Sequence, residues 1–558
     1  MNNWEDDIYK SITKKEIQRL FLIGGIIGAF VFLICYGWKI LGVTYDSWLL
    51  SGDDISQHYI GWKFYRQCEW SFPIGKMDNI LYPSTSCIIF TDSIPILAIF
   101  FKLLSPILPD TFQYFGIWGC LCYFLTGALS AIIVRKSTQS RWNCYISAAL
   151  LAFSPYILQR MYSHTSLAGH WIILAAILIW IYKPYFYTLK RQFLAWSSLL
   201  IVGSLVHIYF IPMIMLFMFG FCLQDVLENN GWKKDLILVP VCMALDIAVL
   251  MGVGAFSKGG GYQDSGLGVY SANLNSLFNP NKRTRFFGHL LIRAGQDEGF
   301  GYLGAGIFLL LGCAIGIYVI YKIRNVHQRR EYVDFCRKNS FSVSLAIVLA
   351  ISFLLACSPT VTFGNKILFG IPYPDFVLKI LETFRASGRF IWCVGYIIMF
   401  WSIMTICFYF KGRKIYVFML AALLMQILDV QPMIEDRRSV VNSQNQFSVL
   451  KSDKWEELAL GKEHVVILPY STVQGINGVI ASYEIGNFAA DHRMTINYFP
   501  VARIDLEEMA LNDCKYIDNA IQDLDRKKCL YIIDTEEKGT ILGLTVQKID
   551  GYLVGIAP

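Results

Sequence analysis

The residues best suited to chemistry follow the first long apolar run of the chain. Asp53 and Asp54 come first, and Gln57, His58 and Trp62 follow closely. In a helix that begins near Asp54, His58 and Trp62 lie at successive turns of the same face. A divalent cation, Mg²⁺ or Mn²⁺, can bind the oxygens of Asp53 and Asp54, or one of these acids can act as a general base. The alternative is a capped helix lying on a membrane surface.

Basic side chains form a second group of candidates. Arg385 and Arg389 flank Ser387-Gly388 where an apolar run begins, and backbone N–H groups at a helix start favour phosphate. The alternative is that both arginines extend to the membrane interface. Arg293 belongs to a Gly-rich basic loop at 255–301. That loop suits either a lid over a lipid phosphate or a solvated connection.

Two further residues have open interpretations. His164 lies near Arg160 and His170, and the spacing of the two histidines is poor for zinc without a third ligand. Binding of a metal or a donor therefore competes with ordinary interfacial polarity. Asp92 is expected to cap a juxtamembrane helix, and is otherwise a second carboxylate for the site.

The composition determines which kind of protein must position these residues. Of the 558 residues, 55% are hydrophobic and only 16% are charged, which excludes a soluble globular enzyme. Lys and Arg are dispersed between apolar runs and form no basic face, so nucleic acid is not an expected partner. No Walker A loop is present, which argues against an ATP-driven pump. We expect an α-helical polytopic membrane protein.

Apolar runs near the length of a membrane span, roughly 20 residues, predict about eleven crossings. They cover 20–41, 111–134, 144–160, 170–182, 192–206, 208–223, 235–254, 302–322, 341–357, 389–410 and 414–430. The division within 192–223 is the least distinct.

The basic residues predict the orientation of the chain. Lys10, Lys14, Lys15 and Arg19 precede the first run, which places the N-terminus in the cytoplasm. The later basic loops are also cytoplasmic if the segment 87–108 does not cross. We therefore expect 87–108 to be a juxtamembrane or re-entrant helix on the outer surface. The outer face then receives the loop 42–110, the loop 255–301 and everything after 430.

The composition becomes polar after residue 430, which predicts two domains. Residues 1–430 form the transmembrane domain, and 431–558 form a small extracytoplasmic α/β domain with β-like runs such as 464–468 and 530–533. Most of the 15 cysteines lie in apolar runs. Two pairs on the outer side are open to disulfide formation or remain free thiols: Cys68 with Cys87, and Cys514 with Cys529.

Several stretches of this sequence resemble a family of bacterial polytopic membrane proteins of uncharacterised function. They are Asp54-x-x-Gln57-His58-Tyr59-x-Gly61-Trp62-x-x-Tyr65-Arg66, Trp70-x-Phe72-Pro73-x-Gly75, Tyr82-Pro83, Thr91-Asp92-Ser93-Ile94-Pro95 and Phe112-Gln113-Tyr114-Phe115-Gly116. The plan of that family resembles the C-type (GT-C) glycosyltransferases. Two later stretches, 297–304 and 385–392, are similar to segments of that family and of YfhO-like lipoteichoic-acid glycosylation proteins.

This resemblance implies an inverting transfer of a sugar from a polyprenyl-phosphate donor, at the outer face of the bacterial cytoplasmic membrane. The acceptor would be a glycan, a lipid or a protein of the cell envelope. The resemblance places the base on the first outer loop, at Asp54 with Asp53 second. His58, Gln57, Trp62, Arg385, Arg389, Arg293 and His164 are then the expected substrate-binding residues.

Two other classes of function compete with glycosyl transfer. A transporter or flippase of a lipid-linked or polar substrate would need ionisable residues deep in several spans. Asp246 is the only acid well inside a predicted span, and a single buried acid usually finds a polar neighbour. A scaffold that displays the C-terminal domain would not need so many spans.

Overall fold

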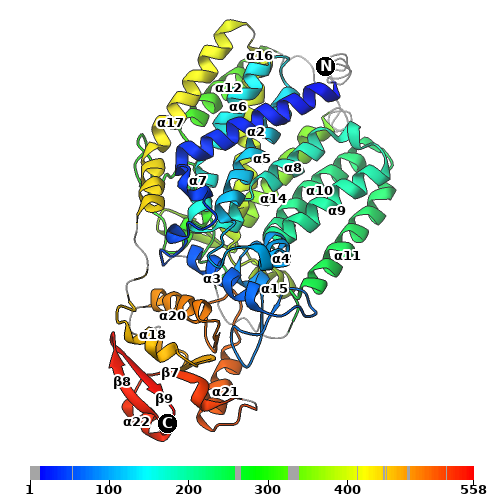
Figure 1. Ribbon diagram of the computed structural model, residues 1–558. Coiled ribbons are helices and arrows are strands. Elements are labelled where there is room, and N and C mark those ends of the chain that lie inside the picture. The colour runs from blue at the N-terminus through cyan, green and yellow to red at the C-terminus, as the bar shows by residue number, and fades with distance from the viewer. Residues whose placement is uncertain are drawn as a thin grey trace.

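The computed structural model describes residues 13–558 except 53, 258–265, 325–338, 411, 444–446, 448, 474–477 and 523. A bundle of long helices forms one end of the molecule, and the C-terminal strands lie at the other end (Figure 1). Helices α3, α4 and α15 lie between these two parts (Figure 1).

The helices of the bundle follow the apolar runs of the sequence. They are α2 (Lys14–Tyr36), α5 (Phe115–Arg135), α6 (Arg141–Ala152), α7 (Pro155–Ser163), α8 (Trp171–Ile181), α9 (Leu189–Val206), α10 (Phe210–Glu228), α11 (Asp235–Val253), α12 (Ala305–Arg324), α14 (Ser340–Cys357), α16 (Ile391–Tyr409) and α17 (Arg413–Asn442).

Seven helical segments in the described part of the chain are long and apolar enough to cross a membrane. They are Lys14–Tyr36, Phe115–Arg135, Phe210–Glu228, Trp232–Val253, Ser340–Cys357, Ser387–Tyr409 and Lys414–Asn442. The expected count of eleven is therefore not reached by this measure. One expected span, 144–160, is divided between α6 and α7, because Pro155 begins a new helix with the Ser154 side chain as its cap.

Small residues bring the first two long helices into close contact. A Cβ atom added at Gly24 of α2 would lie 2.8 Å from the carbonyl oxygen of Gly127 on α5. One added at Gly28 would overlap the backbone of Tyr123. Glycines allow such close approach between backbones in a membrane, where apolar surface alone gives helices little preference for each other over lipid.

The first loop after α2 folds as a compact layer on this bundle. Helix α3 (Asp54–Gln67) is followed by the short strands β1 (Lys76–Met77) and β2 (Ser86–Cys87), the 3-10 helix η3 (Ile88–Thr91) and helix α4 (Pro95–Leu103). Helix α4 has nine residues, about 14 Å, which is too short to cross a bilayer. The expectation that Asp92 caps this helix is wrong, because Ile94 is the residue before Pro95 and no side chain caps it.

Residues 358–390 form a second layer next to the first loop. They contain the antiparallel strands β3 (Thr360–Phe363) and β4 (Lys366–Gly370), helix α15 (Asp375–Thr383) and the 3-10 helix η9 (Ser387–Phe390), which leads into α16. The four cysteines considered for disulfides, Cys68, Cys87, Cys514 and Cys529, are free thiols in this structure.

The C-terminal part contains a five-stranded sheet with the order β6-β5-β7-β9-β8. Its strands are β5 (His464–Leu468), β6 (Thr495–Ile496), β7 (Cys529–Ile533), β8 (Thr545–Ile549) and β9 (Tyr552–Ile556), and its helices are α18 (Lys454–Ala459), α20 (Val479–Asp491), α21 (Leu506–Ile517) and α22 (Glu536–Ile541). Helix α20 packs on α3. There Lys63 of α3 forms an ion pair with Asp491 and donates a hydrogen bond to Asn487.

Candidate functional site

A cavity of about 340 Å³ lies where the first loop, the bundle and the C-terminal part meet. Five segments that are distant in sequence line it: the turn around Asp92, the end of α7 at His164, the end of α9 near His207, the 379–389 segment, and Ala502-Arg503. Its charged and titratable lining residues are Asp92, His164, His207, Lys379, Glu382, Arg385, Arg389 and Arg503.

Close packing on α3 positions the turn that carries Asp92. Gly61 leaves no room for a Cβ atom, because one placed there would overlap the side chain of Thr91. The hydroxyl of Ser93 donates a 2.6 Å hydrogen bond to the carbonyl oxygen of His58. Asp92 itself has φ +54°, a left-handed conformation that Asp adopts more readily than most residues. The turn therefore lies against the face of α3 that carries His58.

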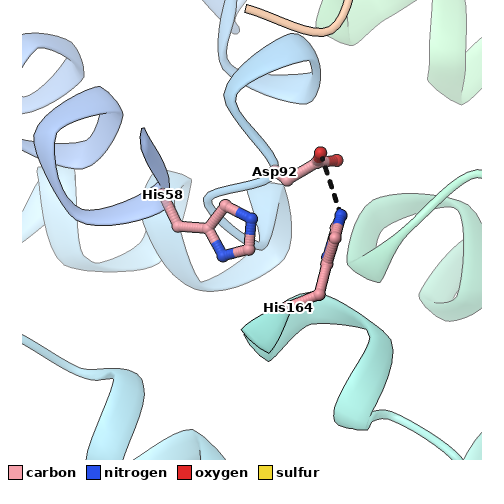
Figure 2. A group of neighbouring side chains, drawn as sticks. All are labelled: His58, Asp92 and His164. Carbon is pink, nitrogen blue, oxygen red and sulfur yellow. Dashed lines mark ion pairs between the residues drawn. The ribbon is translucent and has the colours of Figure 1, made fainter. Parts of the chain in front are cut away.

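Three imidazole rings surround the Asp92 carboxylate. One carboxylate oxygen, Oδ2, is 3.5 Å from Nε2 of His164, and the other, Oδ1, is 3.3 Å from Nε2 of His207. The ring of His58 lies edge-on to that of His164, with 4.7 Å between their centroids. Figure 2 shows His58 and His164 on separate helical segments, with Asp92 on the turn between them.

The Nδ1 atom of each ring lies within hydrogen-bond distance of a neighbouring group. Nδ1 of His58 lies 2.9 Å from Oγ1 of Thr165, and Nδ1 of His164 lies 3.1 Å from Oγ of Ser166. Nδ1 of His207 accepts a hydrogen bond from the backbone N–H of Tyr209 at 3.2 Å. The neutral form of His207 therefore carries its hydrogen on Nε2, which faces Asp92.

Burial determines the charge of this cluster. Burial lowers the pKa of His58 to about 4, and it also lowers the pKa values of His164 and His207 below their usual range. For Asp92, burial alone would raise the pKa, but the neighbouring His207, His58 and Arg389 outweigh it and lower the pKa. At neutral pH the cluster thus contains one ionised carboxylate and neutral imidazoles.

A buried ionic network fixes one wall of the cavity. Nε of Arg389 and Nη2 of Arg160 bind the same oxygen of Glu298, at 2.9 and 3.1 Å. The pKa of Glu298 is lowered, because the two arginines outweigh the opposing effect of burial. Two guanidinium groups share one carboxylate, so the network keeps a net positive charge beside the cavity.

The C-terminal part supplies a further cation. The backbone N–H of Ala502 donates to the carbonyl oxygen of Phe90 at 2.7 Å. The guanidinium of Arg503 then lies over the Phe90 ring, 5.5 Å from its centroid. With Arg385 and Lys379 on the opposite segment, cations face the cavity from both the bundle side and the C-terminal side. Such a lining favours an anionic ligand.

The structure separates the residues that the sequence grouped together. Asp54 is exposed at the first turn of α3 and does not line the cavity, and Asp53 lies outside the described residues. Gln57 is buried and donates to the carbonyl oxygen of Phe90. Trp62 is also buried, and its indole N–H donates to the carbonyl oxygen of Phe112, so it packs in the core and is no open platform for a sugar.

Of the remaining residues singled out from the sequence, some line the cavity and others lie away from it. His164, Arg385 and Arg389 line the cavity, and His58 lies directly behind His164. Arg293, by contrast, is exposed and does not line it. Asp246 is buried in α11 and accepts a 2.8 Å hydrogen bond from Ser204, a polar neighbour of the kind expected for a single buried acid.

Sequence reasoning missed two residues of the site and underrated a third. His207 follows α9 at the least distinct division between apolar runs, and a histidine at the end of such a run was the available signal. Arg503 lies far along the chain, and no local pattern marks it. Asp92 was expected first as a helix cap, with a second carboxylate of the site as the alternative.

The fold and the cavity define a polytopic helical membrane protein whose cavity is lined by charged and histidine side chains. The chain belongs to the family described as the domain of unknown function DUF6311, whose model matches residues 25–431. The DUF6311 C-terminal domain matches residues 454–557.

Among solved structures, the chain is similar to the apo form of the oligosaccharyltransferase of Archaeoglobus fulgidus. The two share 12% sequence identity with a TM-score of 0.40, over 88% of this chain and 65% of the other, so this chain spans less than two thirds of that protein's length. No curated protein matches the sequence.

Proposed function

We propose that this protein is a membrane glycosyltransferase that moves a sugar from a polyprenyl-phosphate donor to an acceptor of the cell envelope. The observation that supports this most is the cavity itself, which combines a cationic wall with the half-buried carboxylate of Asp92. A lipid-linked sugar phosphate has an anionic group and neutral hydroxyls, and the two sides of the cavity match these two kinds of group.

The cationic wall suits the departing phosphate. As the bond between the sugar and the phosphate breaks, negative charge grows on the phosphate oxygens, and fixed cations stabilise that charge. Arg389 is held in place by Glu298, so its position costs no reorganisation during the reaction. Arg385 and Arg503 approach from different segments and can contact the other oxygens of the same phosphate.

A carboxylate suits the acceptor. An acceptor hydroxyl must lose its proton as its oxygen attacks the sugar, and a carboxylate within hydrogen-bond distance can accept that proton. In the cavity this carboxylate is Asp92. The resemblance to C-type glycosyltransferases gives the same role to Asp54, so the two aspartates are alternative bases in this proposal. Inversion at the sugar carbon follows from a single displacement.

The proposed location is the bacterial cytoplasmic membrane, with the N-terminus in the cytoplasm and the cavity on the outer side. The basic residues before α2 support this orientation through the positive-inside rule. The C-terminal part would then lie outside the membrane, where a glycan, lipid or protein acceptor can reach it.

The test is sugar transfer by purified protein in lipid nanodiscs, with a panel of radiolabelled undecaprenyl-phosphate hexoses and cell-envelope extract as acceptor. The double variant Arg385→Gln/Arg503→Gln should raise the donor KM about 10-fold or more, because it removes two charged hydrogen-bond donors from the cavity. Arg293→Gln is the matched control, since Arg293 is exposed and outside the cavity.

Two outcomes would contradict the proposal. Wild-type protein that is folded yet transfers no sugar from any donor would remove it. Equal loss in Arg293→Gln and in the double variant would remove the cavity as the phosphate site.

A further inference from the structure

We propose that His58, Asp92 and His164 form a binding site for one divalent transition-metal ion of the zinc class. One ligand atom from each of the three residues lies within 4.8 Å of the other two. Among the residues that the structure describes, no other trio of histidine, cysteine or acidic side chains gathers its ligand atoms in this way. This site is distinct from the Asp53–Asp54 pair suggested by the sequence.

The strongest observation is the state of His58. Its side chain is fully buried, and its Nε2 atom has no hydrogen-bond partner. A buried polar nitrogen without a partner is costly, so natural proteins rarely leave one unused. Its Nδ1 is engaged by the Thr165 hydroxyl, and if the ring donates there, a lone pair remains on Nε2. A metal ion in the cluster would be the missing partner.

The hydrogen bonds around these residues are of the kind found around metal ligands in proteins. Ligating histidines usually bond through their other ring nitrogen, which fixes the tautomer and the ring orientation. Thr165 and Ser166 are in that position for His58 and His164. His207 donates to the second oxygen of Asp92, so it orients this carboxylate and is a positioning residue here.

The donor set selects the class of metal. Two imidazoles and one carboxylate suit Zn²⁺, Co²⁺ or Fe²⁺, whereas Mg²⁺ and Ca²⁺ prefer oxygen ligands. Ligands of a tetrahedral zinc ion lie about 3.5 Å apart. Nε2 of His164 and Oδ2 of Asp92 already have this separation, so binding would mainly draw the His58 ring closer to them. His164 and Asp92 line the cavity while His58 lies behind it, so the open coordination position would face the cavity.

Binding of the metal does not depend on the proposed sugar transfer, and it is measured alone. The full-length protein is purified with a histidine-free tag, stripped with chelator, and titrated with ZnCl₂, CoCl₂ or MgCl₂. Calorimetry and elemental analysis give affinity and stoichiometry, and thermal unfolding gives the shift in Tm. We expect about one Zn²⁺ per chain and a raised Tm, with no comparable effect of Mg²⁺.

Variants separate a site from adventitious binding. His58→Gln and Asp92→Asn should each lose stoichiometric Zn²⁺, while His492→Gln, which alters a histidine of the C-terminal part, should keep it. His207→Gln should weaken binding about 10-fold without abolishing it, as expected for a residue outside the ligand set. His164→Cys supplies a thiolate in place of an imidazole and should keep Zn²⁺, which also shows that changes at this position allow folding.

Specific results would overturn the inference. Folded wild-type protein that binds no Zn²⁺ or Co²⁺ removes the site, and so does equal Zn²⁺ binding by His58→Gln and wild type. A larger response to Mg²⁺ would remove the proposed metal class. Full sugar transfer by chelator-stripped protein would deny the metal a catalytic role while leaving its binding intact, whereas metal binding without any transfer would contradict only the proposed function.

Discussion

The beginning of α3 and the turn at Asp92 present carboxylates in opposite environments. Asp54 is exposed at the first turn of the helix, outside the cavity. Asp92 comes 38 residues later, yet it lies beside the histidine one turn beyond Asp54, with both oxygens near buried imidazoles. A carboxylate surrounded by buried rings and cations is placed for chemistry, whereas an exposed one has its charge screened by water.

The difference shows that chemically suitable residues that are close together in the sequence need not meet at one site. The stretch from Asp53 to Trp62 contains many chemically suitable residues, but among those that the structure describes, His58 alone belongs to the cluster around Asp92. The remaining members of the site come from the ends of other helices and from the C-terminal part. Four changes test how far this comparison holds.

The largest expected effect is at the two carboxylates. Asp92→Asn should lower sugar transfer by about 100-fold or more, because it removes the carboxylate that acts as the general base in the cavity. Asp54→Asn should have a much smaller effect. The measurement is kcat and KM with the donor that the wild type uses. A loss confined to Asp54→Asn would reverse the comparison and place the base at the start of α3.

The second effect is on stability. Glu298→Gln leaves Arg160 and Arg389 without their shared carboxylate, which should cost about 3 kcal/mol, since uncompensated buried charges are strongly destabilising. Thermal unfolding in detergent measures the loss. Glu456→Gln removes a similar acid from an exposed pair with His492 and should cost about 0.5 kcal/mol or less. Equal losses of stability in the two variants would mean that the ion pairs of Glu298 stabilise the fold no more than an exposed pair does.

The third change moves the turn away from α3. Gly61→Ala introduces a methyl group where the Thr91 side chain already lies, and the strain should cost about 1–3 kcal/mol. Sugar transfer should fall about 10-fold, because Asp92 moves with the turn. Gly312→Ala on α12, where an added Cβ atom meets nothing within 4 Å, is the matched control. Identical behaviour of the two variants would show that the contact does not position Asp92.

The smallest effect concerns a single hydrogen bond. Ser93→Ala removes the hydroxyl that donates to the carbonyl oxygen of His58, at a cost of about 1 kcal/mol. Transfer should fall only severalfold, because the packing of Gly61 on Thr91 still holds the turn. Ser105→Ala, which removes a longer local bond to Phe101, should leave transfer unchanged. A loss as large as that of Asp92→Asn would indicate that Ser93 itself takes part in the chemistry.

Much of the fold could be predicted, because membrane helices are encoded locally. Composition alone excluded a soluble protein, and apolar runs located the long helices. The helix expected to begin near Asp54 is α3, which runs from Asp54 to Gln67. The number of spans was less certain, because short helices such as α6 and α8 read as parts of continuous apolar stretches. Pro155, the first residue of α7, was the local sign of such a break.

The site was predicted only in part. His164, Arg385 and Arg389 were identified from their positions at the mouths of apolar runs, and the cavity contains all three. For Asp92 a helix cap was preferred over a second carboxylate of the site, because a polar residue shortly before Pro95 is a common helix start. Its contact with His207 joins segments whose separation in sequence carries no local signal.

The sequence by itself determined that this is a polytopic membrane protein, where its long helices lie, and which stretches between them carry polar groups. These properties follow from hydrophobic runs and helix-ending residues, which act over short distances along the chain. Only the tertiary structure decided which polar groups meet. The close approach of Gly61 to Thr91 and the docking of α20 on α3 bring Asp92, His164, His207 and Arg503 around one cavity, with His58 behind His164, because packing of distant surfaces, and not spacing along the chain, sets those distances.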